Sequence, residues 1–125
     1  MKFTQTNKAP SAIGPYSQAV VVNGMVYTSG QIALLPDGSE DLLKDGVAPQ
    51  AKQVLENLKA VLEESGSSMD KVVKTTIFLS CMDDFTTVNE IYSTAFGDHK
   101  PVRSTVAVKT LPKNALVEID AIALV

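Results

Sequence analysis

Residues 47–65 read VAPQAKQVLENLKAVLEES, and this stretch decides the fold because its apolar side chains recur with helical spacing. Pro49 suits the first turn of a helix, and Gly66 is placed to cap its C-terminal end. One apolar stripe runs along the segment: Val47, Ala51, Val54, Leu55, Leu58, Val61 and Leu62. We therefore expect a helix over residues 47–65 that packs by this stripe against another layer of structure.

Segments rich in β-branched residues precede this helix. Residues 2–6, 17–22 and 25–29 are the predicted strands. Asn23-Gly24 separates the second strand from the third, and this pair is the strongest short hairpin signal because both residues tolerate a positive φ. The chain before the helix therefore predicts three strands, two of which form a hairpin.

A strand and a second helix are expected to follow. Residues 72–80 are mostly apolar and β-branched, which predicts a strand. The second helix is expected to begin at Asp83 or Asp84, whose carboxylates would cap its free amides, and to end at Gly97. Its expected buried stripe is Phe85, Val88, Ile91, Tyr92, Ala95 and Phe96.

The chain ends in two predicted strands, residues 103–109 and 116–124, around a turn at residues 110–115. One face of the last strand suits the helices: Val117, Ile119, Ala121, Ala123 and Val125. The other face is too apolar for open water yet carries two carboxylates: Leu116, Glu118, Asp120, Ile122 and Leu124. Because such a face is usually an interface, we expect a homo-oligomer whose subunits meet on the helix-free side.

The order of elements, β-β-β-α-β-α-β-β, predicts an α+β fold with one mixed sheet and both helices on one face. The length of 125 residues fits a single domain spanning residues 1–125. The net charge of −3 lacks the basic footprint of a nucleic-acid-binding protein, which argues against such a partner without excluding RNA.

Several further classes of protein lack support in the sequence. One cysteine, Cys81, and one histidine, His99, do not make a zinc site, so no metal is expected. Neither a signal peptide nor an apolar run of membrane-spanning length is present, and we expect a cytoplasmic protein without a membrane partner. No Walker loop or Gly-x-Gly-x-x-Gly element points to a nucleotide cofactor.

Arg103 is the first candidate for chemistry, because its planar fork can donate two parallel hydrogen bonds to a carboxylate. Alternation places Arg103, Thr105 and Ala107 on one face of their strand, and we expect this to be the helix-free face that also carries Glu118. The alternative, which the pattern alone favours, is a structural ion pair or a solvated arginine at the end of a strand.

Glu118 is the second candidate, because a carboxylate among apolar neighbours must be paired or have a perturbed pKa. It would position water or carry a proton, or else form a salt bridge to another subunit, and the pattern leaves both open. If the last hairpin pairs Glu118 with Ala107, Arg103 lies about 13 Å away along the strand. A shared site would then require a bulge or two subunits.

Three other places carry weaker signals. Tyr16 follows the stiff Gly14-Pro15 pair and is either a ligand contact or a packed loop residue. Ser29-Gly30 ends a strand, where a glycine exposes backbone amides, but Ser29 has no histidine partner for a catalytic triad. Asn89 lies near the buried stripe of the second helix, where it would contact a ligand or a neighbouring loop.

Several ordered motifs together resemble the RidA/YjgF family of reactive-intermediate deaminases over essentially the whole chain. They are Ala12-Ile13-Gly14-Pro15-Tyr16-Ser17-Gln18-Ala19, Thr28-Ser29-Gly30-Gln31-Ile32, Asn57-Leu58-Lys59-Ala60-Val61-Leu62, Asp84-Phe85 with Val88-Asn89-Glu90, Pro101-Val102-Arg103-Ser104, and Leu111-Pro112-Lys113 followed by Val117-Glu118-Ile119. The resemblance implies a chorismate-mutase-like α+β fold and a homotrimer with three ligand clefts between subunits. It also implies hydrolysis of 2-iminopropanoate and 2-iminobutanoate to 2-keto acids and ammonia, without a cofactor.

The resemblance also implies roles for particular residues. Arg103 would bind the substrate carboxylate, and the cleft would be lined by Tyr16, Ser29, Gly30, Asn89 and Glu118. Many members have a cysteine where this chain has Thr105, so a role that needs a thiol is in doubt while a lining or hydrogen-bonding role remains. The main alternative is a regulatory or translation-inhibitor-type protein that senses small carboxylates in the same clefts.

Overall fold

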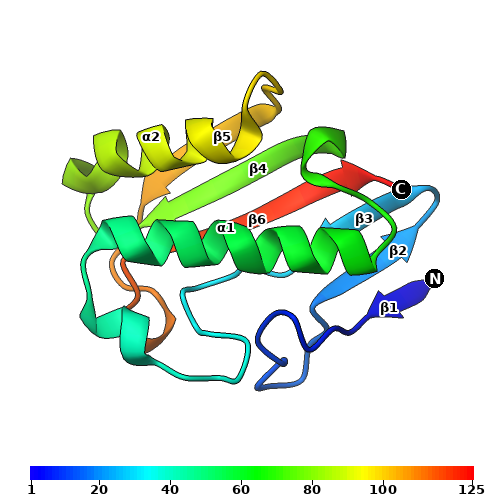
Figure 1. Ribbon diagram of the computed structural model, residues 1–125, viewed down its shortest axis with the longest axis horizontal. Helices are drawn as coiled ribbons and strands as arrows, with labels where there is room; N and C mark the ends of the chain where they lie inside the picture. The colour runs from blue at the N-terminus through cyan, green and yellow to red at the C-terminus, as the bar shows by residue number, and fades with distance from the viewer.

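The computed structural model describes all residues from 1 to 125. Its longest helix confirms the apolar stripe predicted for residues 47–65. Helix α1 (Val47–Glu64) lies across one face of the sheet (Figure 1). Six of the seven expected stripe residues are buried and Val47 is half-buried. Each fully buried leucine of this kind contributes about 1.5–3 kcal/mol to folding. Gly66 takes a φ of 85° directly after the C-cap, Ser65.

The sheet has six strands in the order β1-β2-β3-β6-β4-β5. They are β1 (Lys2–Thr4), β2 (Ala19–Val22), β3 (Met25–Thr28), β4 (Val72–Leu79), β5 (Val102–Ala107) and β6 (Val117–Leu124). Only β4 and β5 pair in parallel, so the sheet is mixed, as expected. Asn23 and Gly24 have φ angles of 51° and 73°, which confirms the predicted turn between β2 and β3.

Helix α2 (Phe85–Phe96) lies beside α1 on the same face of the sheet, which confirms the two-layer arrangement (Figure 1). Val88, Tyr92 and Phe96 are buried, whereas Phe85 and Ala95 are exposed, so the predicted stripe is only partly correct. The remaining helical turns are 3₁₀: η1 (Asp41–Lys44), η2 (Met69–Lys71), η3 (Met82–Asp84) and η4 (Pro112–Asn114).

The expected cap of α2 is wrong, because no side-chain hydrogen bond caps its N-terminus. Asp83 and Asp84 instead lie in η3, which runs directly into the helix.

The predicted hairpin between the last two strands is also wrong, because β4 lies between β5 and β6. Thr75 of β4 pairs with Arg103 on one side and with Ala121 on the other. The reason is the connection through α2, since a strand-helix-strand crossover places β5 parallel to β4 at the sheet edge. Strand β6 then fills the central position between β3 and β4.

The two faces of β6 separate as expected. Val117, Ile119, Ala121 and Ala123 are buried under the helices, although Val125 is 47% exposed. Glu118, Asp120 and Ile122 are half-buried on the opposite, helix-free face. No helix is both long enough and apolar enough to cross a membrane.

Candidate functional site

Arg103 lies on the helix-covered side of the sheet, so the face predicted for it from alternation is wrong. In the parallel ladder its partner is Thr75, which is fully buried beneath α2, and laterally paired residues share a face. Thr105, beside Ile77, faces the same way. Ser104 and Val106, expected in the core, are exposed.

Helix α2 surrounds the Arg103 guanidinium with one amide and two rings. Nη1 of Arg103 donates a hydrogen bond to Oδ1 of Asn89 at 2.8 Å. The guanidinium carbon lies 4.9 Å from the ring centroid of Tyr92 and 5.7 Å from that of Phe85. Phe85, Asn89 and Tyr92 are spaced four and three residues apart, so they share one face of the helix.

No carboxylate pairs with Arg103. The one ion pair in the chain joins Lys113 to Glu40, with 3.1 Å between Nζ and Oε2. The structural ion pair considered from the sequence is therefore absent. The hydroxyl of nearby Thr105 is buried and has no hydrogen-bond partner. Arg103 thus keeps an uncompensated charge, and most of its donors have no partner in the protein.

A pocket of about 210 Å³ opens beside Arg103 and Asn89, and its wall includes Lys100 and no carboxylate. An anion that enters it meets an unpaired guanidinium. We call Asn89, Arg103 and Thr105 the arginine half-site.

Glu118 lies in a different place, against Gly30 on the helix-free side. A Cβ atom built on Gly30 would stand 2.8 Å from the carboxyl carbon of Glu118, so any larger residue here would push this carboxylate aside. A pocket of about 140 Å³ is lined by Tyr16, Gly30 and Glu118, together with Lys113. We call Tyr16, Gly30 and Glu118 the glutamate half-site.

The environment of Glu118 favours its neutral form. Desolvation by burial raises the pKa of this carboxyl group, and the nearby charge of Asp120 raises it further. Glu118 has no ion-pair partner within the chain. A carboxyl group with a raised pKa exchanges protons more readily near neutral pH than an ordinary glutamate does.

Ser29 supports the glutamate half-site without facing it. Its hydroxyl donates to the carbonyl oxygen of Ser17 at 2.6 Å, and its amide donates to the carbonyl of Gln18 at 2.9 Å. The hydroxyl is therefore engaged in holding the loop that carries Tyr16. Tyr16 itself is 51% exposed, which contradicts the alternative of a packed loop residue.

Two buried amides hold the loops of this region; both lie in the motifs that carry the family resemblance, but neither was predicted as a site residue. Gln18 bonds to Thr6 and to the carbonyl of Pro10, and so fixes the N-terminal loop. Asn57 of α1 is fully buried and donates to the carbonyl of Leu34 at 2.8 Å. In the sequence, the burial of Asn57 could have been recognised from its position next to Leu58, among the residues of the apolar stripe.

The two half-sites do not meet within one chain. Arg103 lies on the helix-covered side of the edge strand β5, whereas Glu118 points from β6 to the opposite side. Strand β4 separates them, with Phe78 paired to both Glu118 and Val106. The separation expected from the sequence is present, but it arises from the order of the strands and not from the hairpin register.

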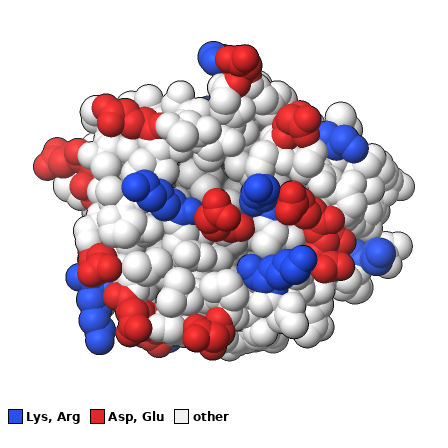
Figure 2. Space-filling model, in the orientation of Figure 1, with Lys and Arg blue, Asp and Glu red and all other residues white.

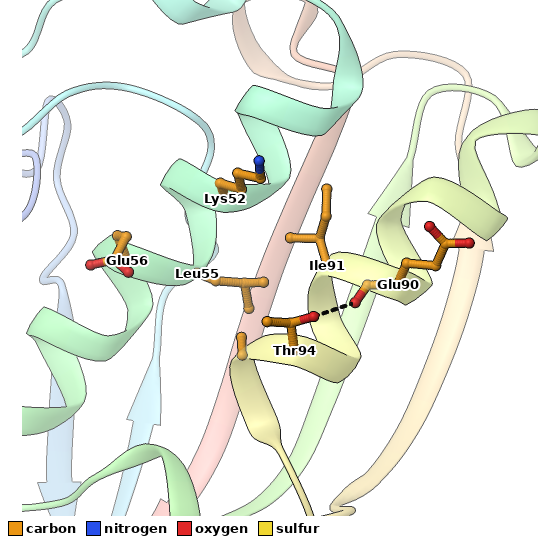
Figure 3. A pocket seen from close by; sticks show the side chains of 7 residues that line it. Lys52, Leu55, Glu56, Glu90, Ile91 and Thr94 are labelled. Atoms are coloured by element: carbon orange, nitrogen blue, oxygen red, sulfur yellow. Dashed lines mark hydrogen bonds between the residues drawn. The ribbon is translucent and has the colours of Figure 1, made fainter.

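The largest pocket lies elsewhere, between α1 and α2, and has a volume of about 540 Å³ (Figure 3). Its walls carry Lys52 and two glutamates, Glu56 and Glu90, over an apolar floor that includes Leu55. Charges of both signs also alternate over the surrounding surface (Figure 2). No unpaired buried polar group faces this pocket, and no group of His, Cys, Asp or Glu residues is arranged to hold a metal ion.

Comparison with known proteins identifies one family, whose members carry different functional descriptions. Residues 6–125 match the family model described as endoribonuclease L-PSP. The 2-iminobutanoate/2-iminopropanoate deaminase of Mus musculus is 49% identical over 98% of this chain and 90% of its own length. A Lactococcus lactis protein described as a regulator, AldR, is 48% identical over 98% of this chain and 97% of its own length.

Solved structures of related proteins have the same fold as this chain. RidA from an Antarctic Psychrobacter species has a TM-score of 0.94 and 40% identity, covering 100% of both chains. Escherichia coli TdcF, solved with bound serine, has a TM-score of 0.93 and 42% identity, covering 100% of this chain and 99% of its own.

Proposed function

Because this chain belongs to the RidA/YjgF family, we propose that it hydrolyses 2-iminobutanoate and 2-iminopropanoate to 2-keto acids and ammonia. The observation that carries the proposal is the unpaired guanidinium of Arg103, which opens on a pocket free of carboxylates. A mouse relative is named for this activity, and TdcF is described with a bound amino acid, which also carries a carboxylate.

A homotrimer would complete the site. The arginine half-site and the glutamate half-site are each incomplete, and they lie on opposite sides of one sheet. We infer that the arginine half-site of one subunit faces the glutamate half-site of the next. The helix-free face, with its half-buried Glu118 and Asp120 and its exposed Tyr27, would be covered in the same assembly.

The proposed reaction follows from these groups. Arg103 holds the substrate carboxylate through paired hydrogen bonds. Thr105, whose buried hydroxyl has no partner within the chain, lies beside Arg103 and outside the 210 Å³ pocket. Glu118 takes a proton from a water molecule as the oxygen of that water bonds to the imine carbon. Glu118 passes this proton to the nitrogen. The carbon–nitrogen bond then breaks as the hydroxyl oxygen forms the carbonyl and gives its proton to Glu118, and ammonia and the 2-keto acid leave. A protonated imine is already electrophilic, so the proposed step needs no cofactor.

The test couples a threonine dehydratase to this protein and follows the loss of imine. Arg103→Ala should lower kcat/KM by about 100-fold, which corresponds to about 2.7 kcal/mol of transition-state stabilisation. Arg103→Lys is the matched control, because it keeps the positive charge but loses the planar fork. Its kcat/KM should lie between those of wild type and Arg103→Ala. If the imine is lost no faster with the wild-type protein than in buffer alone, the proposal is contradicted.

A regulatory role is the second candidate, favoured by the similarity to AldR. In that case the same site would bind a small carboxylate without turning over the imine. Binding of 2-oxobutanoate in calorimetry, combined with no acceleration of imine loss, would support the regulator over the enzyme.

A further inference from the structure

Three contacts enclose Tyr92 and Arg103 in a closed loop. Thr75 and Arg103 are direct partners in the β4–β5 ladder. The hydroxyl of Thr75 forms a 2.7 Å hydrogen bond with the phenol oxygen of Tyr92. The ring of Tyr92 lies 4.9 Å from the guanidinium carbon of Arg103, which closes the loop.

Tyr92 has little freedom to move. It is 7% exposed, and its ring centroid lies 4.5 Å from that of Phe96. Its hydroxyl is anchored on the neighbouring strand, so both ends of the side chain are fixed. Burial raises the pKa of the Tyr92 phenol, and the group therefore remains protonated and neutral at physiological pH.

An aromatic support has a specific advantage for an arginine that must receive an anion. A carboxylate neighbour would occupy the N–H donors of Arg103 and would compete with the substrate. An aromatic face attracts the cation without accepting the two parallel hydrogen bonds that a carboxylate would take. Tyr92 thus holds the guanidinium while its charge and most of its donors remain available.

We propose that Tyr92 is a positioning residue for substrate binding, which sets the direction of the Arg103 fork from a ring anchored by Thr75. This inference rests on the proposed function, because it assigns Arg103 the role of carboxylate receptor. Tyr92 also lines the pocket beside Arg103, but the role proposed for it acts through Arg103. Its removal should therefore weaken ligand binding far more than it slows the chemical step.

The experiment compares Tyr92→Leu with Leu62→Ala. Both substitutions remove buried side-chain volume from a helix, but Leu62 belongs to α1 and lines neither of the pockets that Arg103 lines. Tyr92→Leu should raise KM for the imine, and the dissociation constant for 2-oxobutanoate measured by calorimetry, by roughly tenfold. Its kcat should change less than twofold. Leu62→Ala should also lower the melting temperature but change KM less than twofold.

Two milder variants keep the test decisive if Tyr92→Leu does not fold. Tyr92→Phe retains the ring and should keep KM within about threefold of wild type. Thr75→Val removes the anchor beneath the ring and should raise KM two- to fourfold with kcat unchanged.

Equal effects of the Tyr92 and Leu62 variants on KM, or a fall in kcat with KM unchanged, would overturn the inference. In either case the proposed function would stand, provided that wild type hydrolyses the imine. A wild-type protein that neither binds 2-oxobutanoate nor hydrolyses the imine would overturn both.

Discussion

The carboxylate of Glu118 rests against Gly30, so one added methyl group at residue 30 tests whether this carboxylate must stay in place. Gly30→Ala should leave the fold intact, because Gly30 does not have a positive φ, but it should displace Glu118. We expect kcat/KM to fall by at least tenfold, measured in the coupled imine assay.

Gly46→Ala is the matched control for this substitution. A Cβ atom at Gly46 would meet nothing within 4 Å, and its φ of −70° is ordinary. Its kcat/KM should equal that of wild type. Full activity of Gly30→Ala would show that the position of Glu118 does not matter for the reaction.

The pH dependence of kcat/KM should follow the protonation of Glu118. Burial and the charge of Asp120 raise the pKa of this carboxyl group above its ordinary value of 4.5. If the carboxylate form accepts the proton from water, kcat/KM should fall on acidification, beginning at a higher pH than an ordinary glutamate would give. Glu118→Gln should abolish this acidic limb, and an unchanged profile would contradict the assignment.

The raised pKa of Glu118 also makes the stability of the folded state depend on pH. A carboxyl group whose pKa is raised on folding favours the folded state at low pH, where it is protonated. This contribution is lost as the pH rises through the unfolded and then the folded pKa. Glu118→Gln should therefore be at least as stable as wild type at neutral pH in urea unfolding, whereas a clear loss of stability would indicate an ion pair.

Among the secondary-structure elements, α1 does more than cover the sheet, because Asn57 fixes the loop that follows Gly30. Its amide donates to the carbonyls of Ile32 and Leu34. Asn57→Ala would leave the buried carbonyl of Leu34 without this partner, whereas the carbonyl of Ile32 keeps the amide of Leu34. The free energy of unfolding should fall by about 1–3 kcal/mol. Urea denaturation measures this change.

Gln53→Ala provides the comparison for Asn57→Ala. Gln53 is only half-buried, and its single side-chain bond goes to Asn57 at 2.8 Å. The loss should stay below about 1 kcal/mol. Equal losses for the two variants would mean that the contact with the loop contributes nothing.

The elements themselves could be predicted from the sequence, because local periodicity determines them. The stripe of α1, the Asn23-Gly24 turn and the inward face of β6 were all correct. The order of the strands could not be predicted, because a short connection at residues 110–115 can join two adjacent strands in a hairpin or two strands with β4 between them. That choice depends on long-range packing.

The face of Arg103 was predicted incorrectly for the same reason. Alternation separates residues 103 and 105 from residues 104 and 106, but it does not say which set faces the helices. The partner strand decides this, through buried Thr75. The apolar character of Val106 and Val108 suggested the wrong face, because β5 is an edge strand whose helix-covered side carries the charge of Arg103.

For the whole molecule, the division of the site is the main consequence of the fold. One sheet presents the arginine half-site at its β5 edge and the glutamate half-site on the opposite side. In the closed symmetric trimer that we propose, each cleft takes Arg103 from one subunit and Glu118 from its neighbour. Activity should therefore depend on assembly, and two defective chains should be able to repair each other.

Subunit mixing tests this most directly. Arg103→Ala and Glu118→Gln homotrimers should both be nearly inactive in the coupled imine assay. When the two variants are unfolded together, refolded in equal amounts and assembled at random, each mixed trimer should contain one intact cleft, and about one quarter of the wild-type activity should return. If the mixture stays as inactive as its components while mass spectrometry shows mixed trimers, the two residues do not form a site between subunits.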